Sequence, residues 1–548
     1  MHKTLNLLGQ YRRDLLALLA GVILFSAGLL RAYFVLPYNS DDVGLKALLH
    51  QSLQAHNLKV LVPDDTYLLK IPFNVVLDSI VHRPNLNLFL SGWIQDILIV
   101  IVFYFVAIYF LRRLTTNRNS ELIFIPLFLY LCSNSSVTFL SSIRSPQVRS
   151  IEIAVGFICL WLLDKIIIAP KDSSWTKKKA LKILLTSLLT GLLLFSDPAY
   201  ILFLIVPISI VGLVVYVHKS EYDKFSQLIA YSAASMAVYS AILLLAKDLG
   251  VQVLKVNAAF VAWNNLGSNI SIALNGLLYL ENAQIFGEQL YKASTVLAAL
   301  NLAILLFATL YIPAKIFKLR SFWLTFFAIQ PAFIFGIYAL STNVVNISTS
   351  RYLILIPFYA VLMIAIIISG YYKKLNTQHL IIGAVFIVLA LAQFCVNLSS
   401  ISSNRHDQQN ASSSMLARAV EQTGDAKGYA SYWDANIVSF YSNYYANIFP
   451  LNCSPDGFTI NYWIFNTSSL HKATKDSFII VSGTIDSKNG AAEALTQPAN
   501  CNDSDSVAIR QFGYPSRIIS VSPGTQIYTY DYDLLSKIPN RMQSSVAQ

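Results

Sequence analysis

The sequence predicts a polytopic α-helical membrane protein that ends in a small α/β domain outside the membrane. Three observations lead to this fold class. The mean hydropathy of +0.54 and the 55% share of hydrophobic residues are too high for a soluble protein of 548 residues. Apolar runs long enough to cross a bilayer recur along residues 1–396. Beyond Cys395 the apolar density falls to that of a soluble domain.

We predict eleven membrane spans, with edges uncertain by a few residues. The first does not resemble a cleaved signal peptide, because its apolar run is too long and no small-residue cleavage site follows. The run 183–217 is too long for one helix, and Pro198 favours a break at the preceding Asp197. The spans cover residues 15–36, 93–111, 122–140, 151–169, 183–195, 199–217, 226–246, 294–314, 321–341, 352–370 and 378–396.

The distribution of basic residues orients these spans. Arg12 and Arg13 precede the first span and should hold the N-terminus in the cytoplasm, so an odd number of spans places the C-terminus outside. The inner segments carry 18 Lys and Arg residues, whereas the three short outer loops carry only Arg144, Arg149 and Arg351. This asymmetry explains the formal charge of +11 without a nucleic-acid-binding surface. We expect a bacterial inner (plasma) membrane, because no eukaryotic retrieval signal is present.

Two outer loops, 37–92 and 248–292, are long. In the first, apolar residues at helical spacing predict a helix over 43–53 that lies along the membrane surface, and a second such helix over 71–81. The second loop is semi-polar and aromatic, and its pattern predicts no particular element.

The C-terminal region divides into a Ser/Asn/Gln-rich linker, 397–414, and an extracytoplasmic domain, 415–548. Three runs rich in Ile, Val, Tyr and Phe, bounded by turn residues, predict strands at 478–481, 517–521 and 526–531.

Cys453 and Cys501 are the only cysteines of this domain. Because disulfides persist outside the cytoplasm, we expect these two residues to form one. No Cys or His spacing predicts a zinc site.

Asp41 and Asp42 follow the first span directly, on its outer side. One interpretation is structural, since Ser40 or Asp41 could cap the next helix and complement its dipole. The other is functional: one carboxylate is a general base beside a lipid-facing cavity, since ionisable groups at a membrane boundary are costly. Neighbours on a helix point in different directions, so only one should face a substrate. A divalent metal that needs both carboxylates is left open.

The arginines of the short outer loops, Arg144, Arg149 and Arg351, also allow two interpretations. They could reach lipid headgroups by snorkelling. Alternatively they could bind a phosphate, because the guanidinium group matches phosphate oxygens with two parallel hydrogen bonds. All three are Arg, whereas the inner loops mix in many lysines, and this favours phosphate.

Two further acidic residues lie at the same depth. Asp197 precedes Pro198 and is interpreted as a turn residue, with a catalytic, substrate-binding or metal role as the alternative. Glu152 begins a span near Arg149, and a local ion pair between them is expected.

Taken together, these features resemble the GT-C superfamily of integral-membrane glycosyltransferases, which take sugar from polyprenyl- or dolichyl-phosphate carriers. The resemblance rests on the cytoplasmic N-terminus, the Asp41-Asp42 pair opening a long first outer loop, about a dozen spans and the outer C-terminal domain. The stretch Arg351-Tyr352-Leu-Ile-Leu-Ile-Pro357, at the start of a late span, resembles an Arg-Tyr-Leu…Pro sequence of several such families.

The resemblance implies that Asp41 is the base, that the three arginines hold the leaving lipid phosphate beside Tyr352, and that the anomeric centre is inverted. It implies as partners a polyprenyl-phosphate-linked sugar, a glycan, lipid or protein acceptor of the cell envelope, and the bilayer.

A transporter or flippase of lipid-linked or polymeric saccharide is the alternative. Transporters usually carry internal repeats and ionisable residues near the midplane. This chain has no evident repeat, and its charged groups cluster at span ends. A third interpretation is a non-catalytic scaffold whose outer domain binds a surface polymer.

Overall fold

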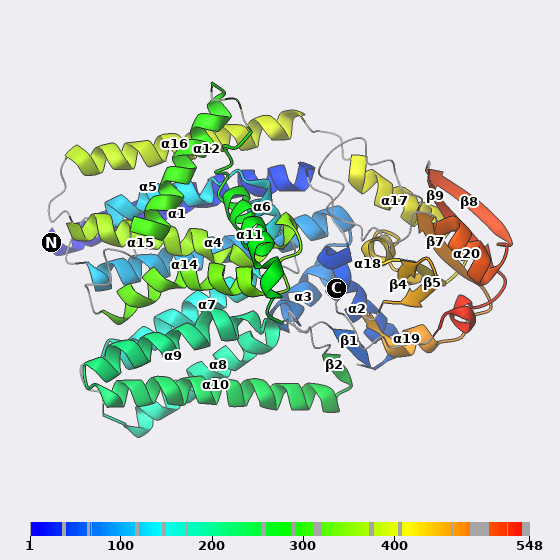
Figure 1. Cartoon of the computed structure of the whole chain (residues 1–548), viewed down its shortest axis with the longest axis horizontal. Helices are drawn as coiled ribbons and strands as arrows, with labels where there is room; N and C mark the ends of the chain where they lie inside the picture. The colour runs from blue at the N-terminus through cyan, green and yellow to red at the C-terminus, as the bar shows by residue number, and fades with distance from the viewer. Residues whose placement is uncertain are drawn as a thin grey trace.

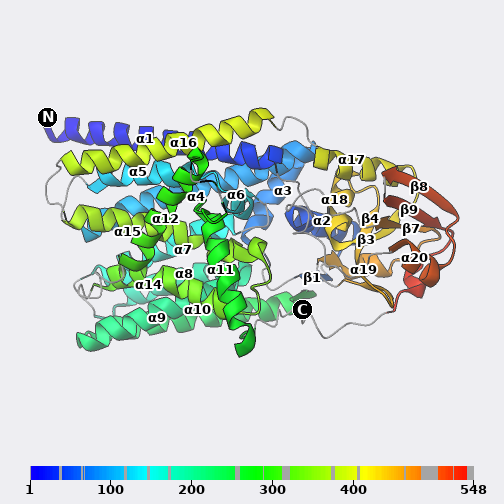
Figure 2. The same cartoon turned by 45° about the horizontal axis from the view of Figure 1, so that its top comes forward.

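The computed structural model combines a bundle of apolar helices at one end with an α/β domain at the other (Figure 1). Figure 2 shows the same division after a 45° turn. The structure describes residues 2–35, 40–57, 59–62, 66, 68–115, 120–144, 149–170, 174–253, 259–287, 289, 291–311, 321–371, 377–403, 408–461, 464–482, 504–522 and 524–539.

The bundle is built from helices rich in Leu, Ile, Val and Phe, because a chain in lipid must satisfy its backbone hydrogen bonds internally. Its α-helices are α1 (His2–Val35), α4 (Pro84–Leu114), α5 (Ser120–Cys132), α6 (Val137–Arg144), α7 (Ser150–Leu163), α8 (Lys177–Ser196), α9 (Val206–Gly212), α10 (Tyr222–Asp248), α11 (Leu266–Leu280), α12 (Ala293–Leu306), α14 (Phe322–Leu340), α15 (Leu355–Tyr371) and α16 (Thr377–Ser403). Short π- or 3₁₀-helical segments accompany them: η2 (Asp164–Ile168), η3 (Ile201–Ile205), η4 (Leu213–Val217), η5 (Trp263–Asn265), η6 (Phe307–Tyr311) and η7 (Ile347–Leu353).

Among the described residues, seven helices are long and apolar enough to cross a membrane, namely those in α1, α4, α8, α10, α14, α15 and α16. The protein is therefore an integral membrane protein. The central helix is α15, whose most apolar window is 94% buried, whereas α10 lies at the periphery with 22% buried. Shorter apolar helices cover 120–132, 201–217 and 293–309. Of these, α12 crosses α15 and α16 obliquely in both views.

Two span predictions have different outcomes. The break at Asp197 is confirmed, because α8 ends at Ser196, Asp197 is not helical, and the helix resumes at Ala199. The prediction of one continuous span over 122–140 is wrong, because α5 ends at Cys132 and α6 begins at Val137. The intervening Ser133 and Asn134 satisfy backbone groups with their side chains, which competes with the helical pattern.

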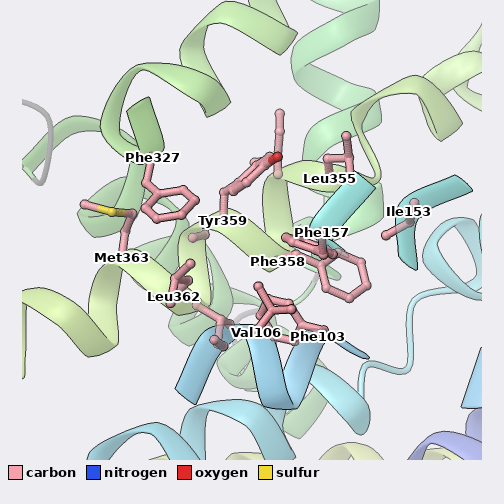
Figure 3. Close-up of a cluster of buried hydrophobic side chains, with 14 of the residues drawn as sticks. Phe103, Val106, Ile153, Phe157, Phe327, Leu355, Phe358, Tyr359, Leu362 and Met363 are labelled. Carbon is pink, nitrogen blue, oxygen red and sulfur yellow. The ribbon is translucent and has the colours of Figure 1, made fainter. Parts of the chain in front are cut away.

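The bundle core is aromatic where α4, α7, α14 and α15 meet (Figure 3). The ring of Phe103 lies 5.2 Å from that of Phe157 and 5.0 Å from that of Phe358, measured between centroids. Such tilted and edge-on pairs are favourable beyond the area they bury. Gly156 permits the close approach of Tyr200, since a Cβ there would lie 2.8 Å from the ring.

Within the described residues, the C-terminal domain contains a six-stranded mixed sheet with the order β5-β4-β3-β7-β9-β8. Parallel pairs join β3 to β4 and β7, and the other pairs are antiparallel. Successive strand residues face the two sides, so α17 and α18 cover one apolar face and α20 the other. Its elements are α17 (Gln408–Glu421), β3 (Lys427–Ser431), α18 (Tyr432–Tyr441), β4 (Asn447–Ser454), β5 (Gly457–Ile460), β6 (Phe465–Asn466), α19 (Thr467–His471), β7 (Ser477–Ser482), α20 (Ser504–Phe512), β8 (Arg517–Ser522), β9 (Thr525–Tyr530) and η9 (Leu534–Lys537).

The three predicted strands are confirmed as β7, β8 and β9, but the linker prediction for 397–414 is wrong. Helix α16 continues to Ser403 and α17 begins at Gln408. Asn397 is fully buried and hydrogen-bonds to Arg31 and to the carbonyl of Ser133. This polar residue therefore belongs to a contact between α16 and α1 and not to a linker. Cys453 is disulfide-bonded, and its expected partner Cys501 lies outside the described residues, so the pairing stays a prediction.

The first of the two long loops, residues 37–92, attaches this domain to the bundle. It and the second, residues 248–292, are called outer loops after their predicted side of the membrane. The first outer loop forms α2 (Ser40–Ala55), β1 (Val60–Val62), η1 (Leu68–Lys70) and α3 (Ile71–Ile80), so both predicted helices are present. Helix α2, however, does not lie exposed on the membrane surface. Its apolar face packs against α18, and the ring of His50 stacks on that of Tyr444 at 4.0 Å.

A small sheet reinforces this attachment. Strand β1 pairs in parallel with β2 (Val251–Val253) of the second outer loop and antiparallel with β6 of the C-terminal domain. The buried amide of Asn466 in β6 donates to Ser52 in α2, and its backbone N–H donates to Gln51. Both outer loops and the C-terminal domain are thereby held together.

One buried ion pair stabilises the C-terminal domain itself. The Lys427 ammonium donates to Asp533 at 2.8 Å and to the Leu470 carbonyl at 2.7 Å, and Tyr429 donates to Asp533 at 3.0 Å. Burial alone would raise the pKa of Asp533. The hydrogen bonds from Lys427, the Leu535 amide and Tyr429, together with the Lys427 charge, lower the pKa overall.

A carboxyl whose pKa is lower in the folded state contributes stability above its unfolded pKa of about 3.9, which is lost as the pH falls through the folded value. We expect Asp533→Asn to lower the free energy of unfolding at pH 7 by about 3 kcal/mol, because Lys427 stays buried without its anion. The deficit relative to wild type should shrink on acidification below about pH 4. Pulse proteolysis of the full-length protein in urea measures it. Asp456→Asn, at an exposed turn, is the control, and an equal loss in both variants would contradict the assignment.

Candidate functional site

Three of the predicted substrate-binding residues meet at the end of the bundle that adjoins the C-terminal domain, which is called the outer end after its predicted side of the membrane. Arg149 immediately precedes α7, Asp197 immediately follows α8, and Tyr352 lies in η7. The Arg149 guanidinium donates from Nε and Nη2 to the two Asp197 oxygens, with 3.3 Å for Nη2 to Oδ1. The guanidinium carbon lies 4.3 Å from the centroid of the Tyr352 ring. The ion pair is buried, with 8% and 1% of the two side chains exposed.

Asp197 also keeps its predicted turn role. Its backbone N–H donates to the Leu193 carbonyl, and its Oδ1 accepts from the Ala199 amide at 3.1 Å. The turn geometry and the ion pair therefore use the same carboxylate, and the two interpretations of Asp197 are not exclusive.

Arg351 lies beside this cluster. Its guanidinium carbon is 5.9 Å from the same Tyr352 ring, and the side chain is partly exposed. The segment η7 that carries both residues is fixed by α11 of the second outer loop. Gly276 permits the contact, because a Cβ there would lie 2.6 Å from the Ser350 Cβ.

A second ion pair, which the sequence analysis missed, joins Lys70 of η1 to Glu152 of α7. The Lys70 Nζ and Glu152 Oε2 atoms are 3.5 Å apart, and both side chains are fully buried. Ser196 donates to Glu152 at 2.7 Å and accepts from the Leu69 amide at 3.3 Å. Burial lowers the pKa of Lys70, while Glu152, Asp96 and Asp197 act in the opposite direction.

The expected ion pair between Glu152 and Arg149 is therefore wrong. Asp197 supplies Arg149 with two acceptor oxygens, and Lys70 from a distant segment supplies the cation for Glu152. Local spacing could not reveal a partner that lies on another outer loop.

Asp96 of α4 is a third buried carboxylate in the same region, fully inaccessible and close enough to Lys70 to affect its pKa. Within the described part of the chain, neither Asp96 oxygen has a hydrogen-bond partner. The sequence did contain a signal, because an acidic residue inside an apolar run is a functional candidate by default. The cluster thus combines two cations, Lys70 and Arg149, with three carboxylates.

A chain of hydrogen bonds leads from this cluster toward α2. Ser150 donates to Gln95 at 2.8 Å, Gln95 to Ser91 at 3.1 Å, and Ser91 to Asn74 of α3 at 3.0 Å. Further along α3 and α4, Asp78 and Asn87 both bond to the buried Lys46 of α2. The ion-pair cluster and α2 are consequently attached to the same two helices.

The first turn of α2 contains Asp41 and Asp42. Their side chains, and that of Arg144 at the end of α6, lie outside the described residues. The start of α2 at Ser40 suits both the capping and the catalytic interpretation, so both stay predictions. Within the described residues, no group of three or more His, Cys, Asp or Glu side chains could hold a metal ion.

Two aromatic residues, Tyr432 and Trp433, begin α18 directly after β3, and α18 packs along α2. Ser431 donates to Asp434 at 2.7 Å, and burial raises the pKa of Asp434 while this hydrogen bond lowers it, with a net increase. Tyr432 and Trp433 are half-buried and in edge-to-face contact. Asp434, like Lys70 and Asp96, is a polar residue that the sequence analysis did not select.

No family model matches the chain, and neither does any curated protein. Among solved structures, it resembles the archaeal oligosaccharyltransferase AglB from Archaeoglobus fulgidus in complex with an inhibitory peptide and a dolichol-phosphate. That match has a TM-score of 0.45 and 12% identity, and covers 79% of this chain and 64% of that chain. The match to the apo form of the Archaeoglobus fulgidus oligosaccharyltransferase has a TM-score of 0.44 and 11% identity, and covers 79% of this chain and 64% of that chain. The chain spans less than two thirds of the length of these enzymes.

The Lys70–Glu152 pair allows a direct test of the cluster. We expect Lys70→Met to destabilise the protein by about 3–5 kcal/mol, because it leaves Glu152 buried without its cation. Lys70→Met combined with Glu152→Leu should recover most of this loss, since a buried pair can be replaced by apolar residues at little cost. Thermal unfolding of detergent-purified protein measures both, and exposed Lys59→Met is the control. Wild-type stability of the single variant would refute the pairing.

Proposed function

We propose that the protein is a membrane glycosyltransferase that moves a sugar from a polyprenyl-phosphate carrier to an acceptor outside the cytoplasm. The observation that carries this proposal is the meeting of Arg149, Asp197, Tyr352 and Arg351 from three distant segments at one end of the bundle. That end also carries α2 with its carboxylate pair and adjoins the C-terminal domain (Figure 1).

The two arginines have different roles in this proposal. Arg149 is buried, and its charge is already opposed by Asp197, so its role is to position the ring of Tyr352. Arg351 is partly exposed beside the same ring, and we assign to it the direct contact with the lipid phosphate. A guanidinium group suits this contact because it donates two parallel hydrogen bonds to phosphate oxygens.

The chemical step is a single displacement. Asp41 accepts the proton of an acceptor hydroxyl as its oxygen attacks the anomeric carbon. The bond between that carbon and the phosphate oxygen breaks, and the electron pair leaves with the phosphate, whose charge Arg351 stabilises. One displacement inverts the anomeric centre. A transfer assay with purified protein and a polyprenyl-phosphate sugar tests the proposal, and lipid translocation in proteoliposomes without transfer would favour the transporter instead.

We expect Asp41→Asn to abolish transfer while expression and membrane insertion stay normal. Asparagine keeps the size and the capping ability of the side chain but cannot take the proton, so the change separates the two interpretations of this residue. Asp42→Asn should be milder unless a divalent metal needs both carboxylates. Initial rates at saturating donor provide the measurement. Wild-type turnover of the Asp41 variant would refute the assignment of the base.

We expect Arg351→Lys to raise the KM for the lipid-linked donor about tenfold, because lysine keeps the charge but loses the planar pair of donors. The matched control is Arg418→Lys on the exposed face of α17. Arg149→Lys should reduce the stability of the outer end as well as donor binding, since it loses the second hydrogen bond to Asp197. If lysine is fully tolerated at position 351 while the Asp41 variant is inactive, the phosphate is bound elsewhere.

A further inference from the structure

A groove lies between α1 and α5. These helices begin at the end of the bundle opposite the C-terminal domain (Figure 2). The groove is open along one side, and its volume is about 450 Å³. Small residues create the hollow, because Ala17 and Ala20 lie one turn apart on α1 and face α5. The lining residues are Arg12, Arg13, Leu16, Ala17, Ala20, Ile125 and Leu129.

The two arginines at the mouth of the groove differ in their partners. Arg13 donates to Glu121 of α5 and, at 3.3 Å, to Asp14, and Arg112 of α4 pairs with the same two carboxylates. These two cations and two anions neutralise one another. Arg12 is exposed, and no carboxylate in the described part of the chain forms an ion pair with it. Among the described residues, the mouth of the groove therefore retains one uncompensated positive charge, that of Arg12.

A cation above an apolar groove between membrane helices matches an anionic lipid. We propose that this groove binds an anionic glycerophospholipid of the leaflet that faces the N-terminus of α1. Its phosphate pairs with Arg12, and one acyl chain lies over Ala17 and Ala20 against Ile125 and Leu129. Snorkelling of Arg12 alone would need no groove. The groove is independent of the proposed transfer site, which lies at the other end of the bundle.

Two variants of the full-length protein test the two halves of this site. Arg12→Gln removes the charge, and Ala20→Trp fills the groove without changing any charge. Each has a matched control on an exposed residue outside the groove: Lys177→Gln, at the start of α8 on the same end of the bundle, and Leu19→Trp on α1, where 55% of the side chain is exposed.

The measurement is lipid occupancy by native mass spectrometry after titration of detergent-purified protein with phosphatidylglycerol or phosphatidylcholine. We expect wild type to prefer phosphatidylglycerol, both groove variants to lose about tenfold in affinity for it, and both controls to keep wild-type affinity. Equal affinity of wild type for the two lipids would overturn the proposal. Wild-type affinity of Ala20→Trp, or displacement of the lipid by millimolar inorganic phosphate, would overturn the acyl-chain contact. If Ala20→Trp fails to fold, the comparison of Arg12→Gln with Lys177→Gln decides the question. An equal loss of affinity for phosphatidylglycerol in these two variants would refute a specific site.

Discussion

The outer end of the bundle depends on the burial of one ammonium group, that of Lys70. Moving such a group out of water costs several kcal/mol, which only close anions and hydrogen bonds can offset. Glu152 at 3.5 Å provides the first anion, and Asp96 and Asp197 add to the potential. Lys70 is the last residue of η1, and α3 begins at the next residue. The burial of the Lys70 side chain therefore fixes the position of the start of α3 relative to α4 and α7. Helix α2 bonds to α3 and α4 through Lys46. The position of α2, which carries the carboxylate pair, therefore also depends on the burial of Lys70.

The cluster around Lys70 is difficult to explain as a device for stability alone. Buried ion pairs are often replaceable by apolar residues without loss, so the five charged groups at this end of the bundle contribute little stability that leucine and phenylalanine could not. What apolar side chains cannot supply is a fixed potential beside a charged ligand. Arg149 is fixed between Asp197 and the Tyr352 ring, so it holds that ring beside Arg351, and a group so constrained does not need to reorganise when the proposed ligand binds. This reasoning favours a site over a scaffold.

Periodicity and composition predicted the parts of the fold that depend on local sequence. The apolar runs located the bundle helices, Pro198 located the break after α8, and β-rich runs located three strands of the C-terminal sheet. The failures occur where tertiary contacts decide. Asn397 was counted as linker because it is polar, yet it is buried against Arg31. For the same reason, local spacing assigned Glu152 to Arg149, whereas its cation comes from a loop some eighty residues earlier.

The small sheet of β1, β2 and β6 relates the two halves of the candidate site. Strand β1 is the central strand, and it follows α2, which carries Asp41 and Asp42. Strand β2 belongs to the same outer loop as α11, which fixes η7 and therefore Arg351. A displacement of either loop would break backbone hydrogen bonds to β1, and β6 attaches the C-terminal domain to the same strand. The carboxylates and the arginine thus share one backbone connection, although about 310 residues separate them in the sequence. A C-terminal domain joined to that strand can affect both halves of the site without contributing a side chain to either.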